Sequence, residues 1–256
     1  MTQRSKKRWT NAAARRLCSL AHDAPSVESA VQTLVDELLL GVSCPPTDLD
    51  AIMARLNVKT HEGRDGLFGS GALLREGDGL KIVYSSQLSY GRKRWTIAHE
   101  LGHAIFEKTG RSPPRHGREL ERLCDMIATE LLLPRKYFGP LAEERTCLDG
   151  VLRLARVFQT SLSATAIRFA EMSGVSVFET QSGKLRWGYG EVRSKFDLAS
   201  EESLVRVVSS SPNCDCGSDE MHLTFRNRTR RWIVEWQRIG SADRRLFMLR
   251  LPDSLC

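Results

Sequence analysis

The motif HELGH, from His99 to His103, constrains the fold of this chain more than any other feature. Histidines four residues apart lie one turn from each other on the same side of an α-helix, so both imidazoles can bind one Zn²⁺ at about 2.0 to 2.1 Å. The residues before the motif, 92–98, contain no helix breaker. We therefore expect a helix from Arg92 to about Lys108 that carries His99 and His103 as zinc ligands.

Glu100 lies beside the two histidines and is the candidate general base. Its carboxylate projects over the metal face and can accept a proton from the water that Zn²⁺ acidifies. A chance match to H-E-x-x-H is expected roughly once in a hundred such chains, so a third ligand is needed to support the motif. An extended motif with a third histidine would need glycine and histidine where this chain has Phe106 and Thr109. The third ligand must therefore come from another element.

A second predicted helix, from about Arg118 to Leu133, offers this ligand. Glu121 and Asp125 are four residues apart and share one face of the helix. We expect Glu121 to complete the zinc site, with Glu119 as the alternative ligand, and Asp125 to accept the other ring N–H of a ligand histidine. The competing interpretation is that these acids are solvated surface residues, which is their usual place.

The segment RKRWTIAHELGHAIFE and the later ERLCDMIATELLLP resemble the ImmA/IrrE family of prokaryotic metallopeptidases. The resemblance covers roughly residues 27–138. Two positions depart mildly from the family pattern, because Asp125 stands where the family commonly has Asn and Leu133 where it often has Met. The resemblance implies an intracellular zinc endopeptidase of the gluzincin type that cleaves a helix-turn-helix transcriptional repressor and so releases stress-response or mobile-element genes.

The remaining pattern predicts an α+β fold. A small zincin-like peptidase domain would contain an α-hairpin, a small antiparallel sheet, the HELGH helix and the glutamate helix, and a helix-turn-helix-like segment and a β-rich C-terminal region would follow it. The expected boundaries are a basic tail at 1–24, the peptidase domain at 25–140, the helical segment at 141–175 and the β-rich domain at 176–256.

Composition favours a cytoplasmic location without a membrane segment. The first 22 residues carry six cations and no acid but lack the apolar core of a secretory signal. They share this composition with organellar transit peptides, although we interpret them as a solvated, partly helical tail. Seven scattered cysteines favour reduced thiols, and no apolar run approaches the roughly 20 residues that span a bilayer.

Three features leave room for a DNA- or protein-binding regulator with a non-catalytic zinc site. The net charge of +7 permits an acidic partner, and residues 151–172 resemble a helix-turn-helix. Its second helix, however, offers only Arg168 to DNA and also carries Glu171, which favours a packing role. A basic stretch with Trp232 and Trp236 could bind nucleic acid or simply be a strand whose cations face water.

Further expectations concern the substrate groove, the oxyanion and a second metal site. The strand LKIVYSS, residues 80–86, could lie at the edge of the sheet and pair with an extended substrate. A donor to the oxyanion could be Arg94, His116 or Tyr137. Cys214-Asp-Cys216 with nearby His222 could suggest a second metal site, but the spacing does not fit a zinc knuckle.

Overall fold

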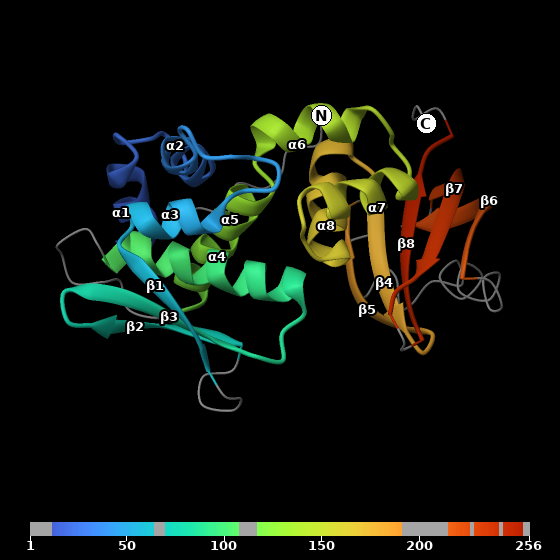
Figure 1. Cartoon of the computed structure of the whole chain (residues 1–256). Coiled ribbons are helices and arrows are strands. Elements are labelled where there is room, and N and C mark those ends of the chain that lie inside the picture. Colours follow the sequence, from blue (N-terminus) through green and yellow to red (C-terminus); the bar gives the residue numbers. More distant parts are fainter. Residues whose placement is uncertain are drawn as a thin grey trace. The chain divides into compact units, whose positions relative to one another are not determined.

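The computed structural model describes residues 12–63, 70–107, 117–190, 215–225, 228–240 and 243–252. These residues form a mixed α+β structure that separates into two compact units (Figure 1). The first unit comprises residues 1–135 and 158–160, and the second comprises 136–157 and 161–256. Among the described helices, none is long and apolar enough to cross a membrane.

Three helices open the first unit. The two helices predicted here are present as α2 (Val27–Leu38) and α3 (Leu49–Arg55), but α2 packs mainly against α1 and α5, and α3 against α4 and β1. Side-chain caps begin both helices, since Ser26 Oγ accepts the N–H of Ser29 and the Asp48 carboxylate accepts the first N–H groups of α3. Apolar residues at helical spacing on α2 face the core: Val27, Ala30, Val31 and Val35.

The described part of the predicted basic tail is also helical. It forms α1 (Ala12–Leu20), which contacts α2 and α5 and buries Ala13, Ala14 and Leu17. A solvated tail would leave these residues exposed, so this stretch belongs to the packed structure of the first unit.

A three-stranded sheet follows, with β1 (Val58–Gly63), β2 (Gly71–Glu76) and β3 (Gly79–Ser85) in the order β1-β3-β2. Strand β2 is antiparallel to β3, whereas β1 is parallel to it. Two expectations are therefore wrong: the sheet is not wholly antiparallel, and LKIVYSS lies in the central strand. Neighbours on both sides of β3 occupy its backbone hydrogen-bonding groups, and β2 is an edge strand.

The two helices that carry the motif residues form the centre of the first unit. Helix α4 (Tyr90–Glu107) packs against α5 (Arg118–Leu132), and its other side lies on β2 and β3 (Figure 1). Pro134 follows the end of α5, as the sequence predicts. A continuous apolar side of α5 is buried: Leu120, Leu123, Cys124, Ile127, Ala128 and Leu131.

The second unit combines three helices with a five-stranded antiparallel sheet in the order β5-β4-β8-β7-β6. One described helix, α6, lies just after Pro134 and was not anticipated. The elements are α6 (Arg135–Glu143), α7 (Leu148–Val157), α8 (Leu162–Ser173), β4 (Ser176–Gln181), β5 (Lys184–Tyr189), β6 (Cys216–Phe225), β7 (Arg228–Arg238) and β8 (Arg244–Arg250).

Helices α7 and α8 are the helix-turn-helix-like pair, and carboxylates of the sheet connect both helices to it. Glu179 on β4 accepts a hydrogen bond from Ser163 of α8, and Glu235 on β7 accepts the N–H of Leu148 at the start of α7. Arg168, the one cation of the would-be recognition helix, is 4% exposed and pairs with Glu171. A side chain held in this way is not available to read DNA.

Candidate metal centre

Three residues of the first unit bring metal-binding atoms together. His99 and His103 project from successive turns of α4, and Glu121 comes from the first turn of α5. Glu121 Oε2 lies 3.1 Å from Nε2 of His99, and Glu121 Oε1 lies 3.6 Å from Nε2 of His103. Within the described residues this is the only cluster of histidine, cysteine and acid groups that could hold a metal ion.

The cluster offers the donor atoms of a zinc site. One ligand atom from each of the three residues lies within 4.8 Å of the others. Two imidazole nitrogens and one carboxylate oxygen are a donor set that catalytic zinc sites use, with a fourth position left open. Both histidines are largely buried, whereas the Glu121 side chain is 47% exposed, so the site opens toward solvent on the side of α5.

Asp125 orients the first histidine. Its Oδ1 lies 2.9 Å from Nδ1 of His99, which places a hydrogen-bond acceptor on the ring nitrogen that does not face the cluster. Burial lowers the pKa of His99, but the hydrogen bond with Asp125 and the negative charges of Asp125, Glu100 and Glu121 together outweigh it, so the pKa lies above its ordinary value. The same pairing keeps the ring in the tautomer whose Nε2 lone pair can face a metal.

Glu100 is buried at 8% exposure, beside the cluster and under the first residue of β2. A Cβ built on Gly71 would overlap Thr96 Cγ2 and lie 3.9 Å from Cγ of Glu100. At its far end β2 reaches Glu107, which forms an ion pair with Arg75. The edge strand therefore runs alongside α4 from the level of Glu100 to the end of the helix.

Neither Glu119 nor Cys124 joins the cluster. One carboxylate oxygen of Glu119 is buried without a hydrogen-bond partner, and Glu121 rather than Glu119 meets the histidines. Burial raises the pKa of the Cys124 thiol well above its ordinary value, and Cys124 is not among the residues that group at the cluster.

Of the three oxyanion candidates, Arg94 points away from the cluster. Arg94 donates from Nη2 to the carbonyl of Thr47 at 2.8 Å, and it lies nine residues, about two and a half turns, before His103 on α4. It is therefore on the opposite side of the helix. Tyr137 belongs to α6 of the second unit, and His116 lies outside the described residues.

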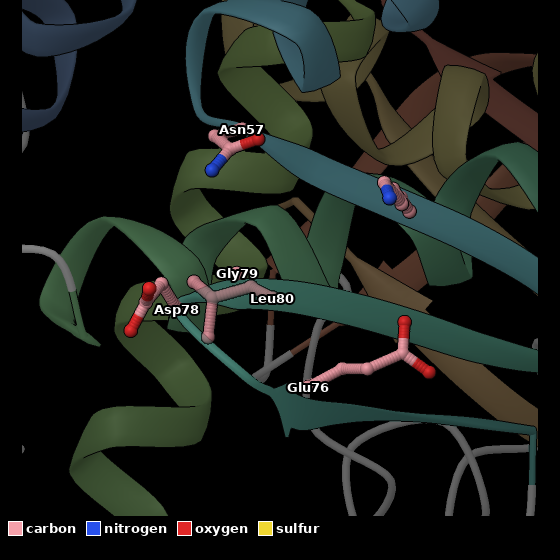
Figure 2. Close-up of a pocket in the computed structure, with 6 residues that line it drawn as sticks. Asn57, Glu76, Asp78, Gly79 and Leu80 are labelled. Atoms are coloured by element: carbon pink, nitrogen blue, oxygen red, sulfur yellow. The ribbon is translucent and has the colours of Figure 1, made fainter.

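A small polar pocket lies elsewhere in the first unit, where β1 begins and β2 turns into β3 (Figure 2). None of the cluster residues lines it, and its Glu76 is paired with Lys81. The pocket is lined by Asn57, Lys59, Glu76, Asp78, Gly79 and Leu80. It mixes both signs of charge, and we assign no chemistry to it.

Comparison with known proteins relates the segment that carries this cluster, two histidines and a glutamate on two helices, to a family of peptidases. Residues 54–170 match the model of the IrrE N-terminal-like domain of peptidase family M78. The segment that carries the cluster therefore belongs to the ImmA/IrrE family.

Two further comparisons concern the whole chain. A solved structure of a Mycobacterium tuberculosis transcriptional regulator is similar, with a TM-score of 0.57 and 14% sequence identity over 92% of this chain and 79% of that one. At this identity the likeness concerns the fold alone. No curated protein matches the chain.

Proposed function

We propose that this chain is a zinc-dependent endopeptidase in which His99, His103 and Glu121 hold the metal and Glu100 is the general base. The observation that carries the proposal is the convergence of these ligand atoms from two helices beside a buried glutamate. The peptidase family match over the same segment supports it.

In the proposed reaction, Zn²⁺ supplies Lewis acidity that polarises the substrate carbonyl and lowers the pKa of the attacking water. Glu100 takes the proton from this water as it attacks and then passes the proton to the leaving amine. Asp125 holds the His99 ring in place through its Nδ1 hydrogen bond, so that Nε2 keeps its direction during the reaction.

The free edge of β2 is the proposed binding site for an extended substrate. The N–H of Ser85 donates to the carbonyl of Ser70 at 3.2 Å, so residues 70 and 85 form a hydrogen-bonded pair of the antiparallel ladder. By alternation, Ala72 and Leu74 also direct their backbone groups to β3. The backbone groups of Gly71, Leu73 and Arg75 then point away from β3, where no described strand pairs with them. A substrate can form main-chain hydrogen bonds at this edge without being selected by sequence.

Two single proline variants, at neighbouring leucines of β2, test the outer edge of the strand and its pairing with β3 separately. Leu73→Pro removes an outward N–H and should lower kcat/KM for a protein substrate about 2- to 10-fold, the effect of one hydrogen bond, with zinc affinity unchanged. Leu74→Pro removes an N–H from the ladder with β3 and should instead lower the melting temperature. Steady-state kinetics and thermal unfolding of both variants test this. Equal loss of kcat/KM in both variants, at equal stability, would contradict a substrate role for the edge.

The proposed substrate is a helix-turn-helix transcriptional repressor in the cytoplasm, whose cleavage derepresses stress-response or mobile-element genes. The ImmA/IrrE resemblance supports this choice, and the substrate stays a proposal. Incubation with the repressor encoded beside this gene tests it: a specific cut that a chelator abolishes and added Zn²⁺ restores is the expected result. Tight duplex binding by this chain with no proteolysis would favour the regulator hypothesis instead.

A further inference from the structure

A close approach between α4 and α5 lies among the residues that form the metal cluster. Gly102 directly precedes His103 and faces Cys124, which stands between Glu121 and Asp125 on α5. A Cβ on Gly102 would lie 2.9 Å from Cα of Cys124, 3.0 Å from its Cβ and 3.3 Å from its Sγ. Real Cβ atoms essentially never come within 3.0 Å of a heavy atom that lies outside their own residue and its neighbours in the chain. With any side chain at position 102, the two helices would have to move apart.

The nearest of these atoms is backbone, which decides how the clash could be relieved. A flexible side chain could rotate away, but Cα of Cys124 moves only if α5 moves. Both residues are buried, and a close-packed interior resists such a shift. Glycine in a helix interior is destabilising relative to alanine, so its presence in α4 calls for a packing reason.

The contacts that depend on this approach are those of the cluster. Glu121 reaches His99 and His103 at 3.1 and 3.6 Å, and Asp125 reaches His99 at 2.9 Å, each joining α5 to α4. A separation of even a few tenths of an ångström would lengthen all three together. Metal sites tolerate only about 0.2 Å in ligand distance, so the spacing of the helices limits the affinity of the site.

We propose that Gly102 is a positioning residue of the metal centre: because it has no side chain, α5 lies close enough to α4 for Glu121 to join His99 and His103 on one ion. The inference rests on the proposed function only in that these three residues bind zinc. It does not require that the chain cleaves a protein.

The test compares zinc affinity, measured by competition with a chromogenic chelator, in the full-length parent and in Gly102→Ala. The variant should bind zinc about 10- to 100-fold more weakly, the range seen when the support of a metal ligand is removed. Substitution by Co²⁺ should also give a changed visible spectrum, because the ligand arrangement differs. Circular dichroism and thermal unfolding establish that the variant is folded.

Two control variants distinguish the spacing of α4 and α5 from the effect of a glycine-to-alanine change as such and from a role of the Cys124 thiol. Gly139→Ala makes the same change in α6, where the new Cβ meets only Cε of Met172 at 2.8 Å, the end of a flexible side chain; zinc affinity should not change. Cys124→Ala keeps Cα and Cβ at the contact but removes the thiol, and it should also bind zinc like the parent. Zinc loss in Cys124→Ala equal to that in Gly102→Ala would point to the thiol and overturn the proposal.

If Gly102→Ala does not fold, Cys124→Gly and the double variant Gly102→Ala/Cys124→Gly replace it. Removing Cβ and Sγ of Cys124 relieves two of the three close contacts but leaves the one with Cα, so the added alanine methyl should still lower zinc affinity relative to Cys124→Gly. If Gly102→Ala folds and binds zinc as tightly as the parent, or the double variant binds it as tightly as Cys124→Gly, the role of Gly102 is refuted and the proposed function is untouched. A parent chain that binds zinc but cuts nothing refutes the endopeptidase proposal alone.

Discussion

Glu100→Gln should lower kcat for cleavage about 10²- to 10⁴-fold while the protein keeps its zinc. Glutamine has nearly the same shape but cannot accept the proton of the attacking water, so the general-base contribution is lost. Glu100 is buried and is not one of the three cluster residues, so the metal should be held as in the parent. The measurements are single-turnover cleavage of a confirmed substrate and the zinc content of the same preparation.

A matched control for this variant is Glu107→Gln, which makes the same change at the end of α4. Glu107 pairs with Arg75 on β2 and lies two turns beyond Glu100, so its loss should leave the chemical step nearly unchanged. Cleavage by Glu100→Gln at the parental rate, with zinc bound, would show that another group takes the proton.

Glu121→Ala should abolish zinc binding at micromolar metal and, with it, all cleavage. The change leaves only two protein ligands and also removes the acid that balances the charge of the ion. We expect zinc affinity to fall by more than about 100-fold, beyond the range for residues that only support a ligand. Equilibrium dialysis with Zn²⁺ measures this directly, and cleavage should return at most partly at high zinc.

Glu119→Ala is the control that distinguishes the two candidate ligands. Glu119 and Glu121 are two residues apart on α5, so their side chains point about 200° apart and only one can face α4. The structure turns Glu121 toward the histidines, so Glu119→Ala should retain parental zinc affinity. The opposite pattern, with zinc lost only in Glu119→Ala, would exchange the two assignments.

The parts of the site that the sequence predicts well depend on helical periodicity. The spacing of His99 and His103 fixes their side of α4 without any knowledge of the rest of the fold. The same periodicity places Asp125, four residues after Glu121, on the same face of α5. Both side chains reach His99 in the structure. Their roles in metal binding and catalysis await the variants described above.

The sheet was predicted less well for a physical reason. Alternation at Leu80, Ile82 and Tyr84 reports that one face of β3 is buried, but it does not report which strands lie beside it. Strand neighbours are joined by backbone groups, which every residue carries alike. The parallel pairing of β1 with β3, and hence the edge position of β2, therefore required the structure.

Gly102 is visible in the sequence as a glycine within a predicted helix, but the sequence does not identify its packing partner. An isolated glycine inside a helical pattern indicates a packing requirement, yet the sequence does not say what packs there. The partner, Cys124, lies 22 residues later on α5. Only the crossing of the two helices shows that the contact falls among the cluster residues.

The division of the chain into units has a consequence for engineering. Residues 158–160 belong to the first unit although α7 precedes them in the second, so the first unit is not one continuous stretch of chain. Phe158 is fully buried, and Gln159 accepts a hydrogen bond from the Tyr90 hydroxyl at the start of α4. A fragment that stops at residue 140 lacks both, and thermal unfolding should show it to be less stable than one that continues to residue 160. An attempt to isolate the first unit must therefore include residues 158–160 as well as residues up to 135.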